Sequence, residues 1–307
     1  MRINDAHCHF FSRHFFEVLS REDPRGRFSA APTEAICAAL EWEPPGTAEA
    51  LADHWLSTLD FQQVNRAVLI ASVPGDEDSV AQAVARDPAR LTGFFMVNPL
   101  VEDASAHVER GLGPLGLKGV CLFPAMHRYH VHEPRALAVA ARVASYPGAA
   151  LFVHCGALTV GIRKKLGLRS RFDSRFGNPL DLQQIAVEYP ALPIIVPHFG
   201  AGLFREALML ADLCPNVYLD TSSTNHWMAY HTGLTLADVF RQALLVAGPG
   251  RLLFGTDSSF FPRGWNRAIC DAQYAALRQL ALPEPDLNAI VGGNFDRLFP
   301  AVAARVA

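Results

Sequence analysis

Two histidines stand one residue apart near the start of the chain, as His7 and His9 at the end of a short apolar run. Residues i and i+2 of a β-strand point to the same face of a sheet. The two imidazoles would therefore converge on one point, which is the arrangement that a bound metal ion requires.

Three further residues with metal-binding side chains occupy the same kind of position later in the chain. His154, His198 and Asp257 each end an apolar, strand-like run. Alone, each has an ordinary explanation, since a single histidine there is usually a core or loop residue and Gly-Thr-Asp is usually a turn or helix cap. Their shared position at the ends of separate strands predicts one metal site.

Short runs rich in Val, Ile, Leu and Phe alternate with helix-like segments along the chain. The runs lack strict alternation, which is typical of strands buried on both faces of a parallel sheet. We predict eight strands, near residues 2–9, 66–72, 91–97, 117–123, 149–155, 193–198, 216–221 and 251–257. The predicted helices cover residues 78–87, 134–144, 181–189, 204–213 and 236–247, and Gly or Pro follows them closely.

Eight alternating β and α units in 307 residues indicate an α/β fold, a (β/α)8 TIM barrel that forms one domain over residues 1–307. In such a barrel the ends of all strands meet at one mouth, where active sites are built. A doubly wound sheet is the alternative, but it gives no reason for strands 1, 5, 6 and 8 to bring their polar residues together. The sequence also lacks the Gly-x-Gly-x-x-Gly motif of a nucleotide site.

Two segments of the chain are not needed to build a minimal eight-stranded barrel. Residues 10–65 contain an aromatic start, a Pro/Gly-rich middle and a helix-like stretch over residues 47–60. We interpret them as an inserted cap after the first strand, which covers the mouth of its own subunit or reaches a neighbour. Residues 283–307 are expected to form a final helix packed outside the barrel.

Composition excludes several classes of partner. Net charge of -3 and a pI near 6.4 give no electrostatic basis for binding nucleic acid or an acidic membrane. We find no signal-peptide pattern and no apolar stretch that could span a bilayer, and the six cysteines are scattered. We therefore expect a cytoplasmic protein that acts on a small molecule, with a homo-oligomer left open.

The motifs around the candidate ligands resemble the amidohydrolase superfamily, and most of all the branch called amidohydrolase 2. That branch includes metal-dependent decarboxylases of the aminocarboxymuconate-semialdehyde type, small lactonases and other hydrolases. The resemblance runs from residue 1 to about residue 300. The segments that carry it are 5–10, 153–156, 197–200, 219–222, 253–258 and 292–299.

The resemblance implies roles for individual residues. His7, His9, His154 and Asp257 would bind one divalent metal ion, zinc in first place and manganese as the alternative, with His198 as the catalytic histidine beside it. Three imidazoles and one carboxylate suit such an ion, which lowers the pKa of a bound water to near 7. Asp257 would also take the proton of that water, and His198 would polarise a substrate oxygen or carry a proton.

Some side chains near these ligands remain open to two interpretations. Asp5 either orients a histidine or has a structural role. Binuclear members of the superfamily carry a bridging lysine or glutamate at the end of strand 4, but Lys118 lies too early and would face away. Cys121 is expected to be a core cysteine, so we predict one ion. Histidines between positions 127 and 132 could form a second metal site, although we expect an exposed loop.

Two reactions fit the predicted ligands. We favour a hydrolase in which activated water attacks an ester, lactone or amide of a small carboxylate-bearing substrate; the alternative is a non-oxidative decarboxylase of an unsaturated or aromatic acid. A non-catalytic scaffold would not need so many ligands. Arg171 and Arg263 are the predicted contacts to the substrate, among mouth residues that include segment 222–227. A buried arginine beside the metal would favour decarboxylation, and an open mouth hydrolysis.

Overall fold

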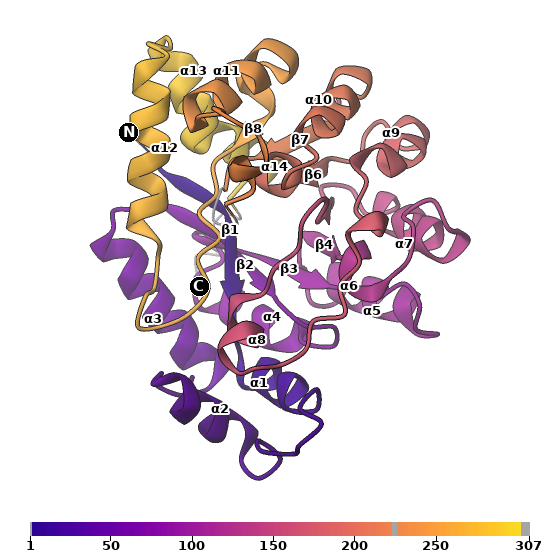
Figure 1. The fold of residues 1–307 in the computed structure, drawn as a ribbon, viewed down its shortest axis with the longest axis vertical. Helices are drawn as coiled ribbons and strands as arrows, with labels where there is room; N and C mark the ends of the chain where they lie inside the picture. The colour runs from indigo at the N-terminus through magenta and orange to yellow at the C-terminus, as the bar shows by residue number, and fades with distance from the viewer. Residues whose placement is uncertain (1, 223–225, 302–307) are drawn as a thin grey trace, which may run out of the picture.

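The computed structural model describes residues 2–222 and 226–301, in which eight parallel strands follow one another around a barrel (Figure 1). Backbone hydrogen bonds from Ala6 N–H to Phe254 O (2.8 Å) and from His9 N–H to Ser258 O (2.6 Å) join the first strand to the segment after the last. The predicted TIM barrel is confirmed. Its strands are β1 (Asn4–Phe10), β2 (Arg66–Ala71), β3 (Leu91–Met96), β4 (Gly119–Leu122), β5 (Ala150–Val153), β6 (Ile194–Val196), β7 (Val217–Asp220) and β8 (Leu252–Leu253).

Helices surround this barrel, and three of them have the predicted bounds. These are α7 (Pro134–Ala144), α10 (Phe204–Leu213) and α11 (Leu236–Ala247). The helix expected at 181–189 is instead a 3-10 turn, η2 (Pro179–Leu182), followed by α9 (Gln183–Glu188). The helices of the other units are α4 (Glu77–Arg86), α5 (Ala104–Leu112) and α12 (Arg267–Gln279), of which α5 and α12 were not predicted. None of the helices in the described ranges is long and apolar enough to pass through a membrane.

The strands are buried on both faces, which explains their almost continuous apolar sequences. On β2, Ala67 and Leu69 belong to the outer core beneath the helices, whereas Val68 and Ile70 belong to a second core inside the barrel. Because side chains alternate across a strand, each short run must supply apolar residues to both cores.

The C-terminal segment closes one end of the barrel, so the prediction of a helix packed outside was wrong. It forms three short elements, α13 (Glu284–Asn288), η6 (Ala289–Gly293) and α14 (Asn294–Leu298). Phe295 and Phe299 belong to the inner core. Arg66 Nη1 donates to Phe299 O (2.6 Å) at the start of β2, so this closure lies opposite the mouth. Residues 302–307 of the predicted helix lie outside the described residues.

The predicted cap is shorter than 10–65. α3 (Ala48–Phe61) packs against α4 and buries Trp55 and Leu59 in the outer core, so it is the ordinary helix of the first unit. The cap proper consists of α1 (Arg13–Ser20), α2 (Pro32–Leu40) and the chain up to Trp42. It shares a small core with α8 (Gly161–Lys165) and the residues after it, and α1, α2 and α8 lie together below the barrel in Figure 1.

Candidate metal centre

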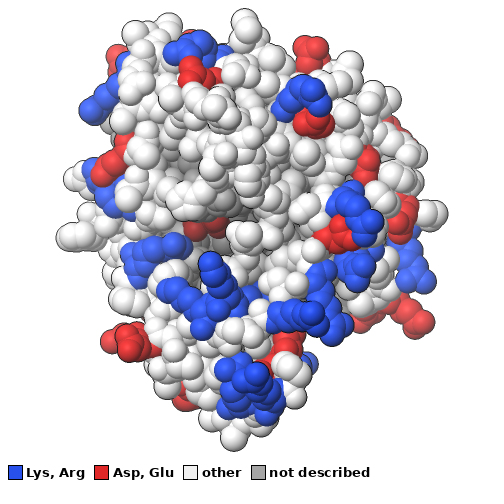
Figure 2. Space-filling view, in the orientation of Figure 1, with Lys and Arg blue, Asp and Glu red and all other residues white. Residues whose placement is uncertain are grey.

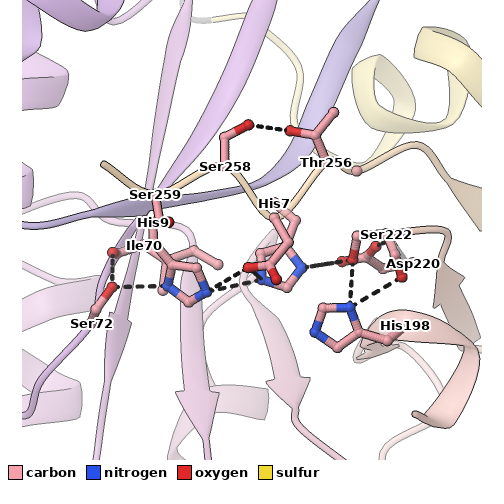
Figure 3. Close-up of polar contacts among 12 residues, drawn as sticks. His7, His9, Ile70, Ser72, His198, Asp220, Ser222, Thr256, Ser258 and Ser259 are labelled. Atoms are coloured by element: carbon pink, nitrogen blue, oxygen red, sulfur yellow. Dashed lines mark hydrogen bonds and ion pairs between the residues drawn. The ribbon is translucent and has the colours of Figure 1, made fainter. Parts of the chain in front are cut away.

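Three ligand atoms, two from β1 and one from the segment after β8, meet at the mouth of the barrel. His7 Nε2 and His9 Nε2 lie 3.2 Å apart (Figure 3). Asp257 Oδ1 lies 3.5 Å from His7 Nε2 and 3.1 Å from His9 Nε2. Two ligand atoms of a tetrahedral ion with bonds of 2.0–2.1 Å are about 3.3 Å apart. The three atoms therefore have the spacing of one face of such a coordination sphere.

Hydrogen bonds on the far side of each ring direct its Nε2 to this point. Ser72 Oγ donates to Ile70 O (3.0 Å) and thus accepts from His9 Nδ1–H (2.8 Å). The Asp220 carboxylate accepts from His7 Nδ1–H at 2.6 Å. With both Nδ1 atoms protonated, two imidazole lone pairs face a carboxylate oxygen, and this set of acceptors calls for a cation.

The charges around His7 also favour a cation at this position. Burial lowers the pKa of His7, but the Asp220 and Asp257 carboxylates outweigh burial and raise this pKa to about 9. Burial raises the pKa of Asp257, yet the hydrogen bond from His9 and the nearby imidazoles hold it well below its ordinary value. The surroundings thus stabilise positive charge between these side chains, whether a proton or a metal ion supplies it.

His154 and His198 lie next to this group as neutral imidazoles. The His198 ring centroid is 5.0 Å from that of His7 and 5.3 Å from that of His154. Burial lowers the pKa of both histidines. His198 Nδ1–H donates to Ser222 O (3.1 Å), which leaves its Nε2 for the pocket. His154 Nδ1 is buried without a hydrogen-bond partner among the described residues.

Two of these side chains, those of His198 and Asp257, belong to residues with a left-handed backbone conformation. His198 and Asp257 have φ values of 55° and 54°, which are uncommon for residues other than glycine and typical of functional sites. The loops after β5 and β6 touch at Gly156, where a Cβ would lie 2.2 Å from Gly200 O. This close approach brings His154 beside His198.

Asp5 holds two backbone segments of the site together. Its carboxylate accepts the backbone N–H of His7 (2.9 Å) and of Thr256 (3.1 Å) and the indole N–H of Trp265 (2.6 Å). Burial raises the pKa of Asp5 to about 6. Asp5 thereby ties β1 to the segment that carries Asp257.

A pocket of about 400 Å³ opens above the histidines. His9, His154, His198 and Asp257 line it together with residues of the cap and of the β5–β6 segment. This volume suits a small molecule. Its aromatic lining residues are Phe11, Phe15, Trp42, Phe123, Phe172 and Phe260.

Two cations stand on the aromatic rim of this pocket, and lysine and arginine side chains gather along one side of the hollow in Figure 2. The Arg263 guanidinium lies 4.4 Å from the centroid of Phe260, and Lys165 Nζ lies 5.5 Å from the same centroid. Arg163 also lines the pocket, but it is buried and pairs with Glu22 at 2.5 Å. Arg171 is exposed and does not line the pocket, contrary to its predicted contact with substrate.

Sequence reasoning placed Ser222 at the mouth and Asp220 in a family-like segment, but it missed that these residues and Ser72 orient the histidines from behind. Each stands at or just past the end of a strand, like the predicted ligands, and that position was the available signal. Segment 223–225, part of the predicted mouth, lies outside the described residues.

The strand-4 residues lie where they were expected. Lys118 is exposed before β4, and Cys121 is buried in the inner core, where burial raises the pKa of its thiol. The histidines at 127–132 were expected to be exposed, but His127 is mostly buried.

Comparisons with known proteins bear on the family and the fold of the chain. A family model described as amidohydrolase matches residues 4–301. Protein fluG of Emericella nidulans is 33% identical over 98 residues, which cover 31% of this chain and only 11% of that protein.

Solved structures show the same fold. A manganese-containing 5-carboxyvanillate decarboxylase from Novosphingobium aromaticivorans has a TM-score of 0.66 and 17% identity over 97% of this chain and 96% of its own. A probable 2-pyrone-4,6-dicarboxylic acid hydrolase from Acinetobacter baumannii has a TM-score of 0.62 and 16% identity over 97% of this chain and 99% of its own. One is a decarboxylase and the other a hydrolase, so the shared barrel leaves the reaction open.

Proposed function

This chain belongs to the amidohydrolase family, in the branch called amidohydrolase 2, and from that premise we propose that it is a metal-dependent hydrolase of a small carboxylate-bearing ester, lactone or amide. The observation that carries the proposal is the meeting of His7, His9 and Asp257 at the base of the pocket, with ligand atoms 3.1–3.5 Å apart. A purely structural site would not need an open pocket or two further imidazoles.

His7, His9, His154 and Asp257 would hold one divalent ion, with zinc as the first choice and manganese as the alternative. Neutral imidazoles and a carboxylate suit both the donor preferences and the charge of such an ion. When bound, the ion supplies the acidity that turns water into a nucleophile at neutral pH and polarises the substrate carbonyl.

Asp257 and His198 would manage the protons of the reaction. Asp257 takes a proton from the attacking water as the new C–O bond forms. His198 is neutral, and Ser222 holds its Nδ1–H, so its Nε2 is free to receive that proton and pass it to the leaving oxygen or nitrogen. The products are a carboxylic acid and an alcohol or amine, and the proton count balances.

Lys165 and Arg263 would bind the carboxylate of the substrate at the rim, while its flat or apolar part lies against Phe260 and Trp42. The rings of Trp42 and Phe260 stack at 4.1 Å, and Lys165 Nζ lies within 5.6 Å of both centroids. A cation held over aromatic rings is well suited to a planar anion.

Decarboxylation of an aromatic or unsaturated acid is the second candidate, favoured by the same aromatic walls and rim cations. It requires a substrate carboxyl group held close to the metal. Among the pocket-lining residues of the described chain, the buried arginine is Arg163, and Glu22 neutralises it. Arg263 stands on the exposed rim. This arrangement favours hydrolysis.

Isotope incorporation separates the two reactions. Purified protein, first assayed for metal content, is supplied with small lactones, esters and aromatic carboxylic acids in H2(18)O and in D2O. A hydrolase places (18)O in the product carboxyl group. A decarboxylase releases CO2 and places deuterium on carbon, which would replace our proposal with the second candidate.

The Asp257→Asn variant tests the shared part of both mechanisms, with Asp212→Asn on the exposed face of α10 as its control. We expect loss of turnover and of metal in the first variant alone. Full turnover by Asp257→Asn, or turnover by wild-type protein stripped of metal, would refute the metal-dependent mechanism.

A further inference from the structure

We propose that His130, His132 and Asp181 form a second transition-metal site, separate from the mouth of the barrel. The two histidines lie in the loop between α6 (Pro124–His127) and α7, and Asp181 lies in η2. None of the three lines the 400 Å³ pocket, so this inference does not depend on the proposed hydrolase.

The ligand atoms have the spacing that an ion requires. His130 Nδ1 lies 3.0 Å and His132 Nδ1 lies 3.6 Å from Asp181 Oδ2, and one ligand atom from each residue fits within 4.8 Å of the others. These two distances bracket the separation of about 3.3 Å between ligands of a tetrahedral ion with bonds of 2.0–2.1 Å. A donor set of two imidazoles and one carboxylate suits zinc, cobalt or nickel.

A simple ion pair does not account for both rings. A hydrogen bond to Asp181 explains the position of His130, but 3.6 Å is too long for a hydrogen bond from His132. The two rings nevertheless lie nearly parallel, at 5.0 Å between centroids and 22° between planes. Both turn toward one oxygen, as they would around a shared cation.

The backbone holds the histidines in place before any ion binds. Tyr129 and Val131 are buried, whereas His130 is half-buried and His132 is exposed, so both histidines reach solvent from this loop. His130 N–H donates to Glu133 Oε1 (2.9 Å), and Glu133 N–H donates back to His130 O (3.0 Å). This reciprocal pair fixes the loop just before α7.

Asp181 is held with similar firmness. Its backbone N–H donates to Asn178 O (3.1 Å), and the neighbouring Leu182 is fully buried. Phe176 packs against the His130 ring at 4.8 Å between centroids. Rigid ligands lose little conformational freedom on binding, which favours metal affinity.

The site opens to solvent. The side chains of His130, His132 and Asp181 are 39%, 50% and 16% exposed. An ion can therefore enter without unfolding the chain, and water can complete its coordination.

Metal binding here would clamp the wall of the pocket. Asp181 follows the segment from Leu158 to Phe172, which lines the pocket between β5 and β6. An ion shared with His130 and His132 would fasten η2, which follows this segment after residues 173–178, to the loop before α7. Its expected effect is a more stable pocket wall, without direct contact with substrate.

Metal counting tests the proposal. Wild type and the His130→Ala/His132→Ala double variant are stripped with a chelator, equilibrated with excess Zn²⁺ or Co²⁺ by dialysis, and assayed by elemental analysis. His107→Ala is the matched control, because His107 lies beside two carboxylates, Glu77 at 2.5 Å and Asp103 at 3.3 Å, without a second imidazole. We expect two ions per chain in wild type and control, and one in the double variant.

Two further variants keep the outcomes distinct. Asp181→Asn, which preserves the shape of the site, should also bind one ion. Combined with Asp257→Ala, it should abolish the rise in Tm that Zn²⁺ gives to Asp257→Ala alone. The second site would be overturned if the His130→Ala/His132→Ala variant still bound two ions. It would also be overturned if wild type and this variant each bound only one ion. Failure of the metal site at the mouth, on which the hydrolase proposal rests, would appear separately, as retention of both ions by Asp257→Ala.

Discussion

Asp220 Oδ2 accepts a hydrogen bond from His7 Nδ1 at 2.6 Å, so a carboxylate on β7 orients an imidazole on β1 (Figure 3). Both side chains are almost completely buried, and Ser222 N–H donates to the other carboxylate oxygen at 2.7 Å. The tautomer and direction of the His7 ring are therefore determined by a residue that does not reach the pocket.

Replacing Asp220 should weaken metal binding without removing a ligand. In Asp220→Ala the His7 ring loses its acceptor, and we expect a 10- to 100-fold loss of metal affinity, which is typical for residues that orient a metal-bound histidine. Competition with a chelating dye measures the affinity. Asp212→Ala, on the exposed surface of α10, is the control. Equal affinity in Asp220→Ala and wild type would remove Asp220 from the site.

Gly255 should tolerate no side chain. A Cβ there would lie 2.7 Å from Asp220 Oδ1 and 3.0 Å from His7 Cβ, so Gly255→Ala must displace the pair. We expect a loss of about 1–3 kcal/mol in the free energy of unfolding, with weaker metal binding. Gly250→Ala is the matched control, since its Cβ would meet nothing within 4 Å. Similar unfolding midpoints for the two variants in urea would contradict the packing argument.

His127 should make the protein less stable in mild acid. Burial lowers its pKa from 6.5 to about 4, so the folded chain keeps it neutral while the unfolded chain takes up a proton below pH 6.5. The contribution of His127 is complete above pH 6.5 and decreases as the pH falls towards 4, by about 2 kcal/mol at pH 5.

His127→Phe removes this titration, so its unfolding free energy relative to wild type should improve between pH 7.5 and pH 5. Urea unfolding of both proteins at the two pH values measures the change, and effects of pH on bound metal cancel in the difference. A constant difference between variant and wild type would show that His127 is solvated.

Arg263 should matter for substrate binding, and Arg171 should not. Loss of a charged contact to a carboxylate costs about 1.5–3 kcal/mol, so Arg263→Gln should raise KM roughly tenfold or more while kcat changes little. Arg171→Gln is the control, since Arg171 is exposed and does not line the pocket. Steady-state kinetics of both variants, on the substrate found in the isotope experiment, measures these changes in KM. A larger rise in KM for Arg171→Gln would show that Arg171, and not Arg263, binds the substrate.

Periodic and positional signals predicted the barrel and the residues that gather at its mouth. Strand bounds are accurate to a few residues because most of the strands are short runs that are apolar on both faces. His7, His9, His154, His198 and Asp257 come together because parallel strands end at the same side of a barrel.

Features that depend on contacts between distant segments were not predictable. The C-terminal turns carry ordinary helical sequence, and only their neighbours show that Phe295 and Phe299 enter the barrel. The role of Asp220 depends on the ring opposite it, and the burial of His127 depends on how its loop folds back. A single sequence records none of these distances.

The C-terminal closure has a consequence for how the protein is made. Phe295 and Phe299 complete the inner core, and Asn294 Nδ2 donates to Leu252 O at 2.8 Å in the last strand. These residues follow all eight strands in the chain and are therefore synthesised after them. The inner core stays incomplete until Phe299 has been added, so the earlier strands keep part of their apolar surface exposed up to that point.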